Sequence, residues 1–544
     1  MSDASTDYVV VGGGLTGCAI ASRLGQSDKK LKVVLIEAGS DSSGDPAAAG
    51  FLSGLSLLGG KFDHVYQSNP EPNTLNRVHS LNSGKALGGG SILNFGGWLR
   101  ADAADYDDWA EMVRDKRWSY DGFKPWFRKT ERFHGSGNDT DTDAHGFDGP
   151  MHVVSISAAE SGERKYPLRE PVKQAWTELG VSFNPQKEKG SITGITEFYE
   201  NSRHGMRQPA NTAYPLENIE VLTNTIVNRV IFSGTTATGV ELANGHKVTA
   251  RREVILCAGT YRTPQLLMLS GIGPSAILNQ AGIPVLHESP HVGQNLHDHF
   301  AIYFAFRLRD PSAGYALGSS SWQNPALCKG LPWDWVVSEP LPAEIITKHE
   351  SDARKQKRNL YEVITVYTPP GIPGIPVDGT HIATSTMLLL PTSRGVVSIR
   401  SSSPSDPPRI QPNYFSTLLD RVTLVHAAKQ TLKAMLATSS MQSIIEGETP
   451  PSGQGLDGLI PLTADASGEA IEERIRQTGI QHHHSGGTAA MGKVVNGEGK
   501  VIGVKGLRVA DASILPIPLG GHPQATLYPM AEQIVSFIIQ DILE

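Results

Sequence analysis

The stretch Tyr8-Val-Val-Val-Gly-Gly-Gly-Leu-Thr-Gly17 stands near the start of a chain of 544 residues and decides its fold. Its apolar, β-branched beginning predicts a strand that is buried on both faces, and residues 15–24 predict a helix directly after it. A second apolar strand over 32–36 ends at Glu37. Strand, glycines, helix, second strand and acid, in this order, predict a Rossmann-like unit that binds a dinucleotide.

The three spaced glycines of this G-x-G-x-x-G stretch each have a physical task. Gly12 permits the tight turn from strand to helix, Gly14 lets the backbone approach a pyrophosphate, and Gly17 allows the helix to pack closely on the strand. The free N–H groups and the positive dipole end of the helix favour phosphate binding. Glu37 can accept hydrogen bonds from an adenosine ribose. The motif alone does not distinguish FAD from NAD.

The composition excludes several classes of protein. A net charge of −7 argues against a nucleic-acid partner, which needs a basic surface. No stretch approaches the roughly 20 apolar residues that span a bilayer, so no membrane partner is expected. The three cysteines are far apart, and the N-terminus shows no secretory signal. We therefore expect a reducing, cytoplasmic location, while noting that a mature secreted chain would look the same.

Two longer segments resemble a known family. They are Gly84-Lys-Ala-Leu-Gly-Gly-Gly-Ser-Ile-Leu-Asn94 and Gly259-Thr-Tyr-Arg-Thr-Pro-Gln-Leu-Leu-Met-Leu-Ser-Gly-Ile-Gly273. Together they resemble the two signature segments of the glucose–methanol–choline (GMC) oxidoreductases. Further matches at 207–214, 292–299, 393–395, 413–414 and in the last sixty residues extend the resemblance over nearly the whole chain, and it weakens over 300–385. The resemblance implies an α/β fold, in which a Rossmann-like FAD-binding domain is interwoven with an α+β substrate domain built on an antiparallel sheet.

The same resemblance predicts how the chain is divided. Residues 1–150, 210–300 and 484–544 are expected to form the FAD-binding domain, and residues 151–209 and 301–483 the substrate domain. The residues themselves predict a buried strand over 253–257 and an alternating strand of the second domain over 395–400. Thr263 and Pro264 predict the start of a helix, with the threonine as N-cap.

The resemblance also implies where FAD is held. Val227 matches the position whose backbone meets the adenine, and Asp511 matches an acid close to the pyrophosphate and ribityl chain. Asn94 matches a residue beside the isoalloxazine ring. Leu93 stands where some relatives carry a histidine bonded to the flavin, so we expect FAD to be bound non-covalently. The other positions expected to contact FAD are Gly89, Ser91, Ala512 and Thr526.

Two histidines match the catalytic positions of this family. His484 stands four residues before Thr488, and His522 occupies a position that is His or Asn in relatives, which places the chain in a His–His subgroup. An alcohol carbon releases hydride only as its hydroxyl loses a proton, and a neutral imidazole accepts a proton at about pH 7. FAD accepts the hydride at N5. We expect His484 to accept the proton and His522 to hydrogen-bond the substrate; the reverse assignment stays open.

The remaining histidines are assigned other roles. His483 is expected to line the substrate pocket and His482 to be structural. No metal is expected, because neither 482–484 nor 297–299 has the spaced pattern of a zinc site and adjacent side chains point apart. His297 and His299 are expected in a loop under the active site.

The leading function is therefore oxidation of the CH–OH group of an alcohol, with oxygen or another acceptor reoxidising the flavin. The tryptophans at 322, 333 and 335 favour a small apolar or aryl substrate. A different class remains open: a lyase resembling hydroxynitrile lyases, in which FAD is structural and a histidine acts as base. A third possibility is a flavoenzyme of specialised metabolism that oxidises a pathway intermediate.

Overall fold

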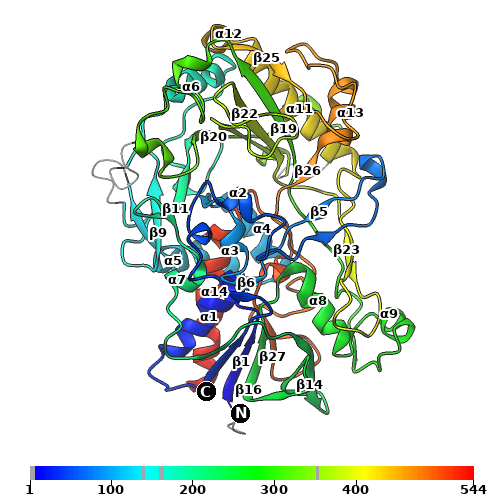
Figure 1. Cartoon of the computed structure of the whole chain (residues 1–544). Coiled ribbons are helices and arrows are strands. Elements are labelled where there is room, and N and C mark those ends of the chain that lie inside the picture. The colour runs from blue at the N-terminus through cyan, green and yellow to red at the C-terminus, as the bar shows by residue number, and fades with distance from the viewer. Residues whose placement is uncertain (1–5, 136–140, 159–163, 351–354, 544) are drawn as a thin grey trace.

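The structure is a computed structural model that describes residues 6–135, 141–158, 164–350 and 355–543 (Figure 1). Two seven-stranded sheets dominate it. In Figure 1 the sheet that contains β1 lies at the end of the molecule where both termini are found, and the sheet that contains β19 lies at the other end. Short helices, α2 to α4, lie between the two sheets.

The first sheet is a parallel core with an antiparallel extension. The parallel order is β13-β2-β1-β16-β27. β15 pairs antiparallel with the first half of β16, and β14 pairs antiparallel with β15. All six residues of β1 are buried, as expected for a strand covered on both faces. The strands are β1 (Thr6–Val11), β2 (Val33–Ile36), β13 (Glu220–Leu222), β14 (Val227–Ser233), β15 (Thr236–Leu242), β16 (Lys247–Leu256) and β27 (Leu507–Val509).

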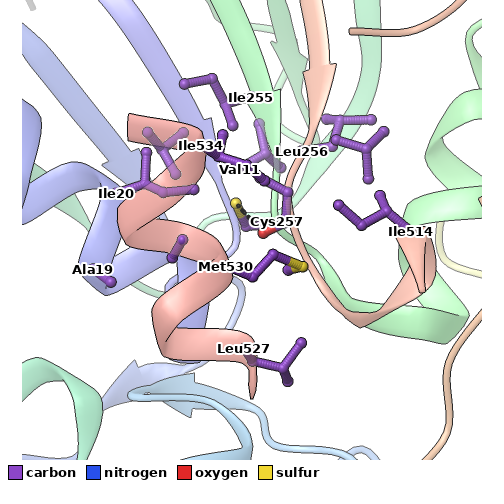
Figure 2. Packing of buried hydrophobic residues seen from close by; sticks show 14 of the residues in the cluster. Val11, Ala19, Ile20, Ile255, Leu256, Cys257, Ile514, Leu527, Met530 and Ile534 are labelled. Atoms are coloured by element: carbon purple, nitrogen blue, oxygen red, sulfur yellow. Dashed lines mark hydrogen bonds between the residues drawn. The ribbon is translucent and has the colours of Figure 1, made fainter. Parts of the chain in front are cut away.

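Two helices from opposite ends of the chain cover this sheet. α1 (Leu15–Gly25) and α14 (Gln524–Leu543) pack against each other. Figure 2 shows Ile20 of α1 beside Ile534 of α14, and Met530 of α14 beside Cys257, which follows β16. All four side chains are buried, so the first and last segments of the chain share one core.

The turn between β1 and α1 depends on close backbone contacts. Gly12 has a φ of +102°, a conformation that side chains rarely adopt, and a Cβ there would collide with the carbonyl of Cys257. A Cβ at Gly17 would collide with the carbonyl oxygen of Gly12. Strand and helix therefore meet at a distance that only glycine allows, in agreement with the roles that the sequence predicts for both residues.

The second sheet is antiparallel throughout its main path, which runs β10-β20-β21-β22-β19-β25, with β26 also paired to β19. One face packs on α11 and the other faces the first sheet across a cavity. The strands are β10 (Gly194–Glu197), β19 (Phe300–Leu308), β20 (Trp333–Glu339), β21 (Tyr361–Val366), β22 (His381–Leu388), β25 (Ile445–Thr449) and β26 (Ile480–Gln481).

The remaining elements connect and cover these two sheets. A third sheet contains β7 (Gly97–Trp98), β8 (Glu131–His134), β9 (Met151–Ser155), β11 (Tyr199–Arg203) and β12 (Met206–Arg207). Short two-stranded sheets are formed by β3 (Ser40–Asp41) with β6 (Ala86–Leu87), β4 (Tyr66–Gln67) with β5 (Ser80–Leu81), β17 (Ile272–Gly273) with β18 (His287–Glu288), and β23 (Val396–Ser398) with β24 (Arg409–Gln411). The other α-helices are α2 (Gly54–Leu57), α3 (Gly90–Leu93), α4 (Ala103–Val113), α5 (Tyr120–Thr130), α6 (Arg169–Glu178), α7 (Ala210–Ala213), α8 (Gly259–Leu269), α9 (Ser275–Gln280), α10 (Ala343–Ile346), α11 (Leu418–Leu436), α12 (Ser439–Gln442) and α13 (Gly468–Thr478).

Two local predictions are wrong in detail. α8 begins at Gly259 rather than at Thr263, so Thr263 is not an N-cap; its hydroxyl donates to Asp511 at 2.6 Å. Pro264 lies inside the helix and cannot donate to the carbonyl of Thr260, which instead accepts from the hydroxyl of Thr488 at 2.6 Å. The strand predicted over 395–400 forms, but as β23 in a separate two-stranded sheet with β24.

The strands of the two main sheets follow the predicted division of the chain. Those of the first sheet fall within 1–150, 210–300 and 484–544, and those of the second lie within 151–209 and 301–483 except for Phe300, the first residue of β19. The third sheet crosses the boundary at 150, because β8 pairs with β9. The division therefore remains a proposal that the two main sheets support. Within the described ranges, no helix has both the length and the apolar character needed to cross a membrane.

Candidate active site

One cavity of about 680 Å³ lies between the two main sheets. It opens at the carboxyl ends of β1, β2, β16 and β27, which is where open parallel sheets bind their ligands. The opposite wall comes from β19 to β22. Most of the residues singled out from the sequence line it: Gly12, Gly14, Glu37, Gly89, Asn94, Val227, Asp511, Ala512, His483, His484 and His522.

Three of the predicted residues do not line the cavity. Gly17 lies behind it, in the contact between α1 and β1. The hydroxyl of Ser91 donates to the carbonyl of Gly88 at 2.6 Å and accepts from a backbone N–H of α7. The hydroxyl of Thr526 is hydrogen-bonded to that of Tyr106 at 2.7 Å. The side chains of these two residues are thus used to fix neighbouring segments of the chain.

The start of α1 forms a cradle with the shape that a pyrophosphate requires. Gly14 caps the helix with a φ of −80°, and a Cβ there would meet only the Cα of Gly89, at 4.0 Å. Such a Cβ would project into the cavity rather than into the protein. The first N–H groups of the helix therefore face open space and are free to bind an anion. The residues present fit a dinucleotide.

Two carboxylates flank this cradle. Glu37 accepts from the N–H groups of Gly13 at 2.8 Å and Gly39 at 2.7 Å, and burial raises its pKa to about 7. Asp511 accepts from Gly259 N at 2.9 Å and from the Thr263 hydroxyl, and burial raises its pKa as well. Each carboxylate is held rigidly by the backbone and still lines the cavity.

The segment from Leu93 to Asn94 forms the wall between the cradle and the histidines. The guanidinium of Arg207 donates to several carbonyls of this region, including that of Asn94. The Asn94 side chain donates to Gln524 at 3.2 Å and accepts from Gly96 N at 3.0 Å. Leu93 presents an aliphatic side chain to the cavity and has no group that could form a bond to a cofactor.

His484 is fixed in one tautomer by its neighbour. Nε2 of His299 lies 3.1 Å from the carbonyl of Leu519 and must donate to it, and burial lowers the pKa of His299 to about 3. Its Nδ1 therefore accepts, and Nδ1 of His484, at 2.9 Å, must donate. Burial, together with the neighbouring histidines, lowers the pKa of His484 well below its ordinary value. Nε2 of His484 is thus an unprotonated nitrogen on a ring that lines the cavity.

The backbone of His484 is fixed as well. Its N–H donates to Asp298 at 2.8 Å, and the other oxygen of that carboxylate accepts from the Tyr414 hydroxyl at 2.8 Å. Burial raises the pKa of Asp298 to about 7. Two adjacent residues, Asp298 and His299, thus hold the main chain and the ring of His484.

His522 is held by a buried carboxylate. Its Nε2 lies 2.9 Å from Oε1 of Glu362, whose side chain is fully buried. The ring packs edge-on against Phe198, and Nδ1 lies on the side of Gly97, a residue that lines the cavity. The rings of His484 and His522 have centroids 5.2 Å apart. The two imidazoles therefore face the same part of the cavity, with one nitrogen of each free.

The other two histidines of the run also line the cavity. His483 adopts a φ of +61° and exposes its ring to the cavity, and burial lowers its pKa to about 4. His482 was expected to be structural; its backbone N–H donates to His299, and its ring faces Ser385 and Tyr303 at the cavity wall. Among the described residues, no group of three or more His, Cys, Asp or Glu side chains could hold a metal ion.

Sequence reasoning missed the residues that support the two histidines. Asp298 and His299 stand in the segment 292–299 that resembles the family, but Asp298 was given no role and His299 was placed only in a loop under the site. Glu362 was not singled out, although it is the single acid in the apolar strand Tyr361–Val366, and a lone charge in such a strand needs a buried partner.

Comparison with known proteins agrees with this architecture. The family model described as GMC oxidoreductase matches residues 6–301 with its N-terminal part and 391–531 with its C-terminal part. The chain is 38% identical to the GMC-type oxidoreductase acuG of Aspergillus aculeatus, over 98% of this chain and 99% of that protein. It is 31% identical to an oxygen-dependent choline dehydrogenase of Paraburkholderia phymatum, over 98% and 92%. A solved structure of Aspergillus oryzae formate oxidase superposes with a TM-score of 0.88 at 26% identity, covering 99% of both chains.

Proposed function

The chain belongs to the GMC oxidoreductase family, and from this premise we propose that it uses non-covalently bound FAD to oxidise the CH–OH group of a small, neutral alcohol. The observation that carries the proposal is the pair His484 and His522, whose free nitrogens face one cavity that also contains the nucleotide cradle. FAD, when bound, supplies the acceptor for the hydride. Gly14, Glu37, Val227 and Asp511 are proposed to hold it.

The two imidazoles are proposed to have different roles. His484 is neutral, and its Nε2 is the unprotonated nitrogen on the cavity side, so it accepts the hydroxyl proton. The fully buried carboxylate of Glu362 accepts a hydrogen bond from Nε2 of His522 and so orients its ring. Nδ1 of His522 is then directed to the cavity, where it hydrogen-bonds the substrate hydroxyl and holds it beside His484.

The overall reaction balances as a two-electron oxidation. The alcohol would lose its hydroxyl proton to His484 and a hydride to bound FAD, and would become a carbonyl compound. Oxygen or another acceptor would then take up the two electrons, and the two protons would leave His484 and the flavin, which restores both. His299 and Glu362 contribute by holding each imidazole in the orientation and tautomer that its role requires.

A screen of alcohols under anaerobic conditions tests the proposed function. The holoenzyme is mixed with benzyl alcohol, short aliphatic alcohols and choline, and the flavin absorbance and the carbonyl product are followed. We expect the flavin to bleach with neutral alcohols, with one carbonyl product formed per flavin, and colour to return when oxygen or a dye is admitted. A flavin that stays oxidised with every alcohol, while a cyanohydrin is cleaved to aldehyde and cyanide, would instead show a lyase.

The pH dependence of flavin reduction follows from the environment of His484. The base must be unprotonated to act, and its pKa lies well below the ordinary value of about 6.5. The rate should therefore stay constant as the pH falls through that value and decline only at lower pH. Rapid mixing without oxygen between about pH 5 and 8 measures this.

Titration of Asp298 could also change the rate of flavin reduction with pH. Asp298 contacts the backbone of His484, and its pKa is raised to about 7. The variant Asp298→Asn keeps a hydrogen-bond acceptor but cannot titrate, so its profile should retain the same acidic limb. The assignment of His484 as a buried neutral base is contradicted if the wild-type rate already falls by half near pH 6.5 or above and the rate of Asp298→Asn falls in the same way.

A further inference from the structure

The wall of the cavity opposite the nucleotide cradle is built from one face of the second sheet. The register places Tyr303 of β19, Ser385 of β22 and Ile364 of β21 side by side in one row. Two residues further along β21, Val366 pairs with Ala383, which in turn pairs with Ala305. The first row carries hydroxyl groups, and the second is apolar.

The hydroxyl groups of the first row form a small polar cluster with His482. The Ser385 hydroxyl lies 3.2 Å from Nε2 of His482, and Ser385 is the cross-strand neighbour of Tyr303. The ring of His482 stacks on that of Tyr303, with centroids 6.2 Å apart and planes 9° apart. The backbone N–H of His482 donates to the carbonyl of His299, so the cluster is attached to the residue before β19 that also holds His484. Tyr303 is half-buried and lines the cavity.

The rest of this wall is apolar or neutral. Within the described part of the chain, the residues that β19 to β22 and their connections contribute to the cavity carry no formal charge: Tyr303, Leu331, Trp333, Ile364, Val366, Thr368, Pro370, Gly371 and Ser385. The indole N–H of Trp333 is already used, because it donates to Glu200 at 2.8 Å. A ligand that reaches this wall can therefore meet aromatic and aliphatic surface and one hydroxyl cluster, but no ion pair.

The cluster is next to His484, because the ring of His482 lies between those of His484 and Tyr303. Ring centroids are 5.2 Å apart for His522 and His484, 5.0 Å for His484 and His482, and 6.2 Å for His482 and Tyr303. A substrate whose CH–OH group lies at His484 and His522 would thus direct its far end toward the Tyr303 hydroxyl. An aromatic ring between them would contact Ile364 and Val366, the apolar side chains of β21 that line the cavity.

We propose that Tyr303, positioned by Ser385 and His482, binds a second neutral oxygen on the substrate, so that the substrate class is an aryl alcohol with a ring hydroxyl. This inference rests on the proposed function, since it assumes that the CH–OH group lies at the two histidines. One hydrogen bond of this kind contributes about 0.5–1.5 kcal/mol, which corresponds to roughly a ten-fold preference at most.

The test compares Tyr303→Phe with the wild type on paired alcohols. The substrates are benzyl alcohol, 4-methoxybenzyl alcohol, and 3- and 4-hydroxybenzyl alcohol. In the wild type, at least one hydroxylated substrate should have a kcat/KM about ten-fold above that of benzyl alcohol, and Tyr303→Phe should abolish this preference by lowering the value for the hydroxylated substrate about ten-fold more than the value for benzyl alcohol. Tyr361→Phe is the matched control, because Tyr361 lies on the opposite face of β21 and should alter neither value.

A binding measurement separates this inference from the proposed function. Calorimetry on the oxidised holoenzyme compares the affinity for 4-hydroxybenzaldehyde with that for benzaldehyde. The measurement requires only that these aldehydes bind, not that they react. A selective loss of about ten-fold in the affinity for the hydroxylated aldehyde in Tyr303→Phe supports the inference even if no alcohol reduces the flavin. The inference is overturned if Tyr303→Phe affects both members of each pair equally. It is also overturned if choline reduces the flavin faster than any hydroxybenzyl alcohol does. Either result would leave the proposed alcohol oxidation itself intact.

Discussion

Flavin reduction in His484→Ala is expected to be slower than in the wild type by on the order of a hundred-fold or more, with FAD still bound. The imidazole of His484 carries the free Nε2 that we propose as the proton acceptor, and alanine removes it without entering the nucleotide cradle. Rapid mixing with a reactive alcohol under anaerobic conditions gives the rate, and the absorbance of the purified protein gives the flavin content.

Three further variants sharpen this result. His484→Asn keeps a donor for His299 but offers no basic nitrogen, and should be nearly as slow as alanine. Added imidazole should restore part of the rate to His484→Ala, because the space left by the ring remains open to the cavity. His246→Ala, at an exposed turn that does not line the cavity, should behave as the wild type. If His484→Ala reduced the flavin as fast as the wild type does, His484 would not be the proton acceptor.

Loss of FAD is the expected result of Gly14→Val. The φ of −80° at Gly14 suits any residue, so the substitution does not strain the backbone. The added side chain enters the cavity at the start of α1, where the phosphates are proposed to lie. The purified variant should be colourless, and its Tm should no longer rise with added FAD, since a ligand stabilises only the protein that binds it.

A matched control is available in the same chain. Gly447 lies in β25, has open space around its Cβ position and does not line the cavity. Gly447→Val should retain full flavin content, and its Tm should respond to FAD as in the wild type. Gly14→Val that purifies with one flavin per chain would contradict the assignment of the cradle.

The sequence predicts the nucleotide half of the molecule well, because its structure depends on short-range geometry. The order of β1, the glycines, α1 and β2 is set by residues that are neighbours in the chain: Gly12 has a positive φ, and Gly17 is required by its contact with the carbonyl of Gly12. The start of α8 is less predictable. Thr263 and Pro264 are typical of a helix start. The helix begins earlier, and the hydrogen bond that Pro264 cannot donate to the carbonyl of Thr260 is replaced by one from the hydroxyl of Thr488, more than two hundred residues away.

The catalytic histidines could be located from the motifs around them, but their chemical states could not. The tautomer of His484 depends on His299, which is 185 positions away, and the orientation of His522 depends on Glu362, 160 positions away. The hydroxyl cluster on the second sheet depends on the register of β19 and β22. Pairings over such separations are decided by the packing of whole sheets, and no local pattern contains them.

The most direct test of the account is the anaerobic reaction of the holoenzyme with benzyl alcohol that carries deuterium on the alcohol carbon. The central claim is that the cavity between the two sheets is where the C–H bond of an alcohol breaks while His484 takes the hydroxyl proton. The account predicts that the flavin bleaches and that deuterium on carbon slows the bleaching several-fold. Flavin that remains oxidised with benzyl alcohol and with every other neutral alcohol would contradict it.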